Sequence, residues 1–289
     1  MELLRALAVL AESPERDGAG RVAASLGLGD VPPADVYAEL FVFQLYPYAS
    51  VYLGAEGMVG GEARDRVAGF LAALGLEPPA EADHLALMLA AYARLAELAG
   101  EEAAELAEAE VGARANWRGA RRAFLWEHLL SWLPAYLDKL AEVAPPFYRA
   151  WGALVGESLR AEARAHGPAP AALPLHLRAT PALADPAESG AEEFLRSLLA
   201  PARSGMILTR ADLARAARAR GLGARAGGRA FTLKSMLGQD AAAVLAWLAA
   251  EADAWAARHA ARRPLHGPAA AWWESRARAT AEVLRNTDV

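Results

Sequence analysis

The chain of 289 residues contains no cysteine, and this absence excludes several kinds of site at once. Without thiols there is no disulfide framework, no thiolate nucleophile and no cysteine-based zinc site, and a reducing compartment is compatible with the sequence. With 55% hydrophobic and 22% charged residues, a chain of this length can bury a core large enough to fold without cross-links.

Alternating runs of β-branched residues are also missing. Isoleucine occurs once, at Ile207, and threonine is rare. Apolar residues recur instead with the 3.6-residue period of the α-helix, between glycine and proline punctuation. We therefore predict an all-α fold.

The N-terminus lacks a long apolar run. The stretch MELLRALAVLAESPERDG has an acidic second residue and only about nine mostly apolar positions before charges return, too few for a membrane span. It also lacks the basic start of a signal peptide. We expect a cytoplasmic protein without stable membrane insertion.

Positive charge is scarce in the first part of the chain. Residues 1–199 hold 16 Arg and Lys against 28 Asp and Glu, a net charge of −12, whereas residues 200–289 hold 14 against 7, a net charge of +7. An acidic body disfavours nucleic acid and attracts cationic partners at short range. We expect a basic partner and no nucleic acid for this part.

Prolines divide the chain. Residues 166–188 contain five of them, which excludes a regular helix across this stretch and marks a linker or an extended strap. We therefore predict a helical domain over residues 1–165 and a basic helical segment over 189–289.

The segment EADHLALMLAAYARLAE, residues 81–97, sets polar side chains at the start of an amphipathic helix. Its apolar face has i, i+3, i+4, i+7 spacing and includes Met88 and Tyr92. Asp83 stands just ahead of this face, where its carboxylate can cap free N–H groups at the positive end of the helix. His84 lines up with Met88 and Tyr92, near the mouth of any groove that the helix borders.

The segment FLWEHLLSWLPAYLDKL, residues 124–140, carries a second histidine on an apolar stripe. His128 shares this stripe with Trp132, so we expect it among apolar neighbours. Glu81 or Asp83 can reach His128 if the two helices pack side by side. A carboxylate partner would raise the pKa of His128 and desolvation would lower it, and the residues alone leave both directions open.

Proline interrupts the second segment. Pro134 lies inside the periodic run, where it removes one helical hydrogen bond and is expected to kink the helix about one turn below Trp132. Such a kink can open a cleft.

Three segments in order carry a family resemblance: FVFQLYPYASVYLGAEGMVGG (41–61), EADHLALML (81–89) and EHLLSWLPAYL (127–137). They are similar to the tyrosine- and proline-marked segment, the acidic-x-Pro-Asp-His motif and the His and Trp-Pro segment of the TorD/DmsD/NarJ-type cytoplasmic chaperones, which mature molybdenum-containing redox enzymes. The resemblance covers roughly residues 34–165. Ala82 stands where that family usually has proline.

The resemblance implies a multi-helix, bundle-like TorD/DmsD-type fold, here with an additional C-terminal helical segment. It implies a chaperone, not an enzyme, that binds the twin-arginine signal peptide or the apo form of a molybdenum-containing oxidoreductase before export. Neither a cofactor, a metal nor a catalytic residue is expected, and the resemblance allows a homodimer. The family motif residues correspond to Glu81, Asp83 and His84, and further to His128, Trp132 and Pro134.

The chemistry of such a leader agrees with this interpretation. A twin-arginine leader has a basic end and an apolar stretch, so its receptor needs carboxylates beside an apolar groove. Because the leader must be released again, we expect about micromolar affinity, a binding free energy of about 8 kcal/mol. The expected peptide-binding residues are Glu81, Asp83, His84, Met88, Tyr92, Glu127, His128, Trp132 and Pro134.

Two other functions are open to the sequence. Residues 208–237 superficially resemble a helix-turn-helix, with Thr209 capping a helix that ends at Gly221, but the turn is long and glycine-rich. A metal-dependent hydrolase would rest on the acidic and histidine residues of the two segments. That spacing contains no His-Glu-x-x-His pair.

Overall fold

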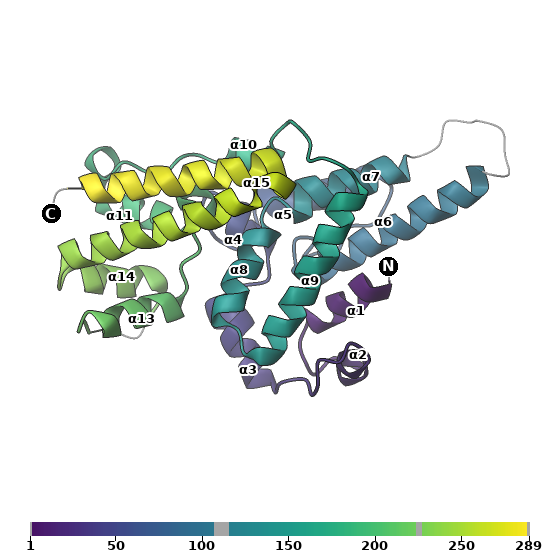
Figure 1. Cartoon of the computed structure of the whole chain (residues 1–289), viewed down its shortest axis with the longest axis horizontal. Coiled ribbons are helices and arrows are strands. Elements are labelled where there is room, and N and C mark those ends of the chain that lie inside the picture. The colour runs from purple at the N-terminus through teal and green to yellow at the C-terminus, as the bar shows by residue number, and fades with distance from the viewer. Residues whose placement is uncertain (1, 107–115, 224–226, 288–289) are drawn as a thin grey trace. The chain divides into compact units, whose positions relative to one another are not determined.

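The computed structural model describes residues 2–106, 116–223 and 227–287 (Figure 1). Over these residues the regular elements are helices, without a β-strand, and the all-α prediction is confirmed. An isolated antiparallel bridge joins Tyr48 to His84.

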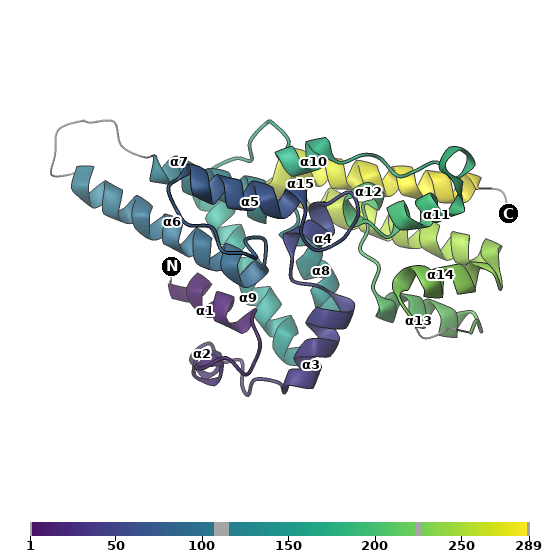
Figure 2. The ribbon, with the colours of Figure 1, turned by 180° about the vertical axis from the view of Figure 1, so that it is seen from behind.

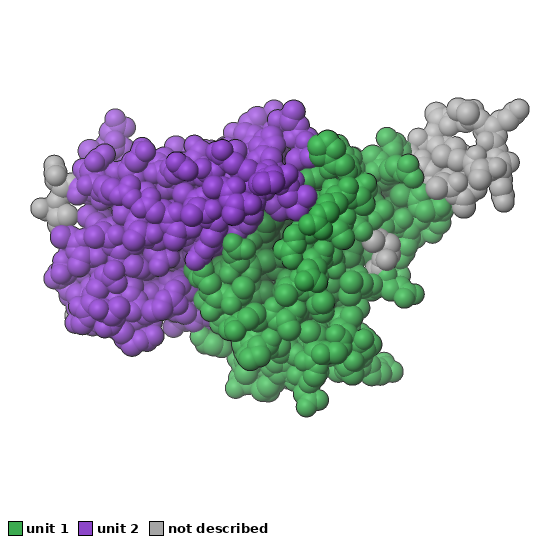
Figure 3. Space-filling model, viewed as in Figure 1, with its two compact units in different colours: residues 1–42, 47–50, 60–168 green, residues 43–46, 51–59, 169–289 purple. Residues whose placement is uncertain are grey.

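The chain forms two compact units, coloured separately in Figure 3. Unit 1 consists of residues 1–42, 47–50 and 60–168, and unit 2 of residues 43–46, 51–59 and 169–289. The stretch 43–59 thus contributes to both units, which the sequence did not lead us to expect. The division at 166–188 was a prediction from proline content, and within that stretch Leu175–Ala179 form a short helix.

The first part of the chain is built from two long helices, α6 and α9, and several shorter ones. In chain order these are α1 (Glu2–Leu10), α2 (Ala19–Ser25), α3 (Ala34–Ala38), the π-helical η1 (Glu39–Gln44), α4 (Ala49–Leu53), α5 (Glu62–Ala73), α6 (Leu85–Leu106), α7 (Trp117–Phe124), the π-helical η2 (Leu125–Leu129), α8 (Leu133–Val143) and α9 (Pro146–Ala165). In unit 1, α6 packs against α1 and α7, while α9 packs against α1 and α8.

Aromatic side chains fill the core of unit 1. Phe41, Tyr148 and Trp151 meet edge to face, with ring centroids 4.9 to 6.5 Å apart. The Trp151 indole N–H donates to Leu7 O (3.0 Å), so this large ring is buried without leaving its polar atom unpaired.

Unit 2 contains the remaining helices: α10 (Leu175–Ala179), α11 (Pro186–Leu198), α12 (Pro201–Ser204), α13 (Arg210–Ala219), α14 (Arg229–Leu237) and α15 (Ala241–Asn286). Gly267 has φ 48° and interrupts α15, so its two arms fold back side by side (Figures 1 and 2). An ion pair between Asp253 and Arg285 joins the arms.

A buried histidine lies between the arms of α15. The His259 ring stacks on Trp255 and on Trp273, with centroids 5.5 and 5.6 Å away. Its Nε2–H donates to Gly205 O (2.9 Å) while Nδ1 accepts from Arg262 (2.8 Å), which defines a neutral imidazole. Burial, followed by the nearby Arg262 charge, lowers the pKa of His259 to about 3.

Candidate peptide-binding site

The acidic motif, residues 81–84, forms the turn that precedes α6, and this turn lies against residues 47–50. Leu85 N donates to Pro47 O (2.8 Å), and Ala49 N donates to Asp83 O (2.9 Å). Two of the motifs that the sequence singled out therefore form one hydrogen-bonded cluster within unit 1.

Asp83 is the buried member of this cluster. It is 1% exposed, and its Oδ2 accepts from Ser50 N in the first turn of α4 (3.0 Å). The carboxylate thus caps α4, and the expectation that it caps its own helix is wrong. His84 takes that role in α6, where its Nδ1 accepts from Ala86 N (3.2 Å). The residues of α6 alone cannot show that a second helix start lies within reach of Asp83.

The His84 imidazole is buried against an aromatic ring. Its ring meets Tyr48 edge to face, with centroids 4.8 Å apart. Burial lowers the pKa of His84 and outweighs the opposing effect of Glu81 and Asp83. Because Nδ1 accepts a hydrogen bond, the proton of the neutral ring sits on Nε2.

Glu81 is the exposed carboxylate of the cluster. It accepts a hydrogen bond from the Tyr48 hydroxyl (3.1 Å). Burial and then this hydrogen bond raise the pKa of Tyr48 to about 12, so the phenol remains a donor at neutral pH. The turn therefore presents one solvent-facing negative charge on a backbone held by Asp83.

The second motif is not a kinked helix. The run divides into α7, η2 and α8, with a turn at residues 130–132, and Pro134 occupies the first turn of α8. The expected kink at Pro134 is wrong, because the missing N–H of proline costs nothing in a first turn, where no intrahelical acceptor exists.

His128 lies among apolar neighbours, as the stripe predicted. It is 5% exposed, and its ring centroid is 5.0 Å from Phe70 and 5.1 Å from Phe124. Burial lowers the pKa of His128 to about 4. Glu81 and Asp83, the carboxylates considered as its partners, bond to Tyr48 and Ser50.

Three of the predicted peptide-binding side chains are in the core. Met88, Tyr92 and Trp132 are 0% exposed, and the Trp132 indole N–H donates to His128 O (2.9 Å). Glu127 and Pro134 are half-buried. In this conformation, the core residues can meet a peptide only if the surrounding helices part, and their role in binding stays a prediction.

Sequence reasoning missed a polar network farther along α6. The Tyr92 hydroxyl donates to Glu162 Oε2 (2.5 Å) and lies 3.3 Å from His166 Nε2. The Arg121 guanidinium also bonds to Glu162 and stacks over the Tyr92 ring at 5.3 Å. These residues come from three helices and the end of α9, and no local pattern in the sequence brings them together.

Exposed apolar side chains concentrate in one stretch of the sequence. Val42, Phe43, Tyr46, Met58 and Val59 are between 38% and 69% exposed. All fall within residues 42–59, around the tyrosine- and proline-marked motif.

Two further properties concern the described part of the chain alone. No group of three or more His, Asp or Glu side chains there is arranged to hold a metal ion. Within the same residues, every helix is too short or too polar to span a bilayer.

Comparison with known proteins shows which proteins the motif region resembles. Residues 33–138 match the family described as the nitrate reductase delta subunit. Two curated proteins named "Chaperone protein TorD", from Vibrio vulnificus strains YJ016 and CMCP6, are each 33% identical to the chain over 100 residues. That alignment covers 33% of this chain and 44% of each relative, so less than half of the curated relatives is matched. No solved structure matches the chain.

The matched residues include all three motifs on which the resemblance rests, in the same order. The resemblance predicted from the sequence is thereby confirmed. Over residues 33–138, the chain is similar to the family described as the nitrate reductase delta subunit, and over 100 residues it is similar to the proteins named TorD.

Proposed function

We propose that this protein is a chaperone in the maturation of a redox enzyme. In this proposal it acts in the cytoplasm, without catalysis and without a cofactor of its own. It binds the twin-arginine signal peptide or the apo form of a molybdenum-containing oxidoreductase before export. The family match and the names of the relatives support the chaperone role.

The observation that carries the leader-binding part is the exposed Glu81 carboxylate on a rigid turn. Asp83 and His84 are buried and accept hydrogen bonds from Ser50 N in α4 and Ala86 N in α6, so they act as positioning residues. A guanidinium of the leader would bond to Glu81 with charge assistance. Because the turn is held in advance, little ordering opposes this contact.

The test is titration of a fluorescent twin-arginine leader peptide with the full-length protein. We expect saturable binding of about micromolar affinity. Glu81→Gln should weaken binding about fivefold, since the charge is lost while the side-chain shape is kept. A leader with two glutamines in place of the arginines should bind the wild type as weakly as the original leader binds Glu81→Gln.

Glu77→Gln is the matched control, because Glu77 is also exposed and lies four residues earlier in the same connection between α5 and α6. It should leave the affinity unchanged. Equal weakening by Glu77→Gln and Glu81→Gln would reduce the effect to general electrostatics. Absence of any saturable signal with the wild type would refute leader binding.

A homodimer, which the resemblance allows, belongs to the same proposal and is tested by light scattering during gel filtration. The helix-turn-helix alternative gains nothing from the family match. Its second helix, α14, is 9 residues long, and the connection from α13 includes residues 224–226, which lie outside the described residues.

A further inference from the structure

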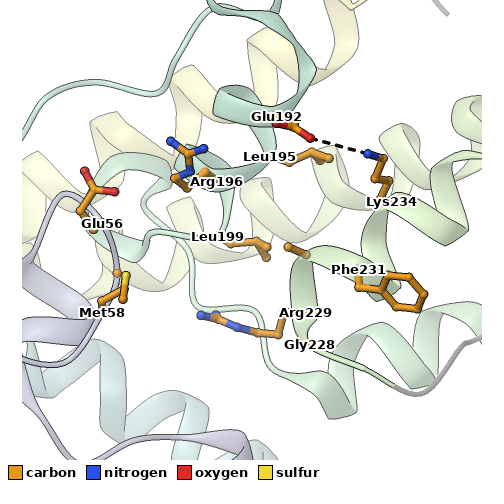
Figure 4. A pocket seen from close by; sticks show the side chains of 12 residues that line it. Glu56, Met58, Glu192, Leu195, Arg196, Leu199, Gly228, Arg229, Phe231 and Lys234 are labelled. Atoms are coloured by element: carbon orange, nitrogen blue, oxygen red, sulfur yellow. Dashed lines mark ion pairs between the residues drawn. The ribbon is translucent and has the colours of Figure 1, made fainter.

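Unit 2 contains an open cavity of about 550 Å³ (Figure 4). One side is formed by residues 56–58, and the other sides are formed by residues that come more than 130 positions later in the sequence. It is lined by Glu56, Gly57, Met58, Glu192, Leu195, Arg196, Leu199, Gly228, Arg229, Ala230, Phe231 and Lys234. The volume is within the usual range for small-molecule sites, about 300–1,000 Å³.

The start of α14 forms one wall and is left without a side-chain cap. Its N-cap residue is Gly228, and residues 228–231 all line the cavity. The first N–H groups of a helix have no intrahelical acceptor and carry the positive end of the helix dipole. The neighbouring α13 differs, because Thr209 and Asp212 close its start with a capping box.

Arg229, the first residue of α14, adds a full positive charge to this wall. Its Nη1 donates to Leu208 O (2.8 Å), a neutral partner. Among the residues that the structure describes, no carboxylate forms an ion pair with it. Arg229 is half-buried, and this burial lowers the pKa of its guanidinium.

The other two cations of the cavity already have carboxylate partners. Arg196 pairs with Glu193 (2.7 Å), and Lys234 pairs with Glu192 (3.8 Å), the pair drawn in Figure 4. Glu56 adds an exposed negative charge on the opposite side. The cavity therefore has one half-buried cation without a carboxylate partner among the described residues, and a ligand with several negative charges would meet the carboxylates of Glu56 and Glu192.

Apolar side chains cover much of the remaining wall. Met58 and Phe231 are 69% and 51% exposed, and Leu195 and Leu199 also line the cavity. Gly57 has φ 63°, and a Cβ there would lie 3.1 Å from Ala200 Cα. The backbone at Gly57 therefore passes close to Ala200, the residue before α12.

We propose that this cavity binds an amphipathic monocarboxylate. The carboxylate bonds the Arg229 guanidinium and the free N–H groups at the start of α14, and the apolar body lies on Met58 and Phe231. The carboxyl end of an apolar peptide and a medium-chain fatty acid share this chemistry. The site is separate from the leader-binding turn and does not depend on that proposal.

The test uses two carboxylate probes with neutral counterparts, titrated into the full-length protein by calorimetry. N-acetyl-leucyl-leucine and its amide represent a peptide end, and octanoate and octanamide represent a fatty acid. We expect at least one carboxylate to bind about tenfold more tightly than its amide. The probe that binds identifies the source of the ligand. Equal binding of acid and amide, or no binding of either acid, overturns the proposal.

Arg229→Gln should reduce the affinity for the carboxylate to that of the amide. Arg210→Gln is the matched control, since Arg210 is the first residue of the capped helix α13 and is exposed, and it should change nothing. Because Arg229 also bonds Leu208, Phe231→Ala serves as a second variant. Its exposed ring carries little of the fold, and its loss should weaken both acid and amide severalfold. Unchanged affinity in folded Arg229→Gln, or in Phe231→Ala, contradicts the assignment.

Discussion

The start of α6 in unit 1 and the start of α14 in unit 2 differ in how the free N–H groups of the first helical turn are treated. The turn before α6 is acidic, and its buried polar atoms are bonded within the protein, from Asp83 to Ser50 and from His84 to Ala86. The start of α14 has a glycine N-cap and a desolvated arginine, and it faces a cavity.

This difference teaches how to separate a structural polar group from one that is available to a ligand. A buried group with a partner inside the fold contributes to stability, and its removal leaves that partner unsatisfied. A charged group that is exposed, or that has no opposite charge beside it, is available to a molecule from outside. Asp83 is buried and bonded and is therefore structural, whereas the exposed Glu81 and Arg229, which has no carboxylate partner among the described residues, are the groups to test for binding.

The largest expected effect concerns acid, because each unit buries a neutral histidine. The folded-state pKa of His128 is about 4 and that of His259 about 3, both below the unfolded value of 6.5. The unfolded chain therefore binds more protons below pH 6.5, and stability falls as the pH drops. His128 alone should account for about 3 kcal/mol between pH 6.5 and 4.

Urea unfolding at pH 7 and at pH 4 measures this loss. A phenylalanine suits the site between Phe70 and Phe124. His128→Phe should therefore remove much of the acid-induced loss of stability that arises in unit 1. His259 should continue to lower stability in that variant. An identical pH dependence in wild type and His128→Phe would show that His128 is not the group responsible.

Breaking the closed start of α6 should have the next largest effect. Asp83→Ala removes a charge-assisted bond and leaves Ser50 N–H buried without its partner, at a cost of about 2 kcal/mol. Chemical denaturation of this variant beside Glu77→Ala measures the difference. Glu77 is exposed, so its substitution should change stability by less than about 0.5 kcal/mol. Similar values for both would contradict the structural role of Asp83.

Removing the cap of α13 should cost less. Thr209→Ala loses the bond from Asp212 N to the threonine hydroxyl and is expected to destabilise unit 2 by about 1 kcal/mol. Thermal unfolding is a sufficient measurement. Unchanged stability of Thr209→Ala would mean that the capping box of α13 does not stabilise the protein. The difference between the capped start of α13 and the uncapped start of α14 would then have no energetic consequence.

The smallest expected effect on stability is a gain. Gly228 has φ −66°, and a Cβ added there would meet no other atom within 4 Å, so an L side chain fits this position. Gly228→Asp can therefore supply the cap that α14 lacks, worth about 0.5–1 kcal/mol. The new carboxylate should also compete with a carboxylate ligand, and probe affinity should fall as melting temperature rises. A stabilised variant with undiminished probe binding would mean that the ligand does not use the start of α14.

Local sequence patterns were sufficient wherever the deciding contacts lie within a few residues. The 3.6-residue period determined the helical class, the stripe through His128 determined its apolar setting, and Thr209 was identified as a cap three residues ahead of its partner Asp212. The three motifs in order likewise indicated the family that residues 33–138 resemble.

Tertiary structure decided what depends on partners distant in the chain. Asp83 caps a helix that begins more than 30 residues earlier in the chain. Pro134 lies in the first turn of α8, because a turn separates this helix from the preceding one. The Tyr92 hydroxyl donates a hydrogen bond to Glu162, which lies 70 residues later. The cavity combines residues 56–58 with residues 192–234. Periodicity shows which face of a helix is buried, but only packing determines which atoms that face meets, because pairwise contact energies depend on distances that a one-dimensional pattern does not contain.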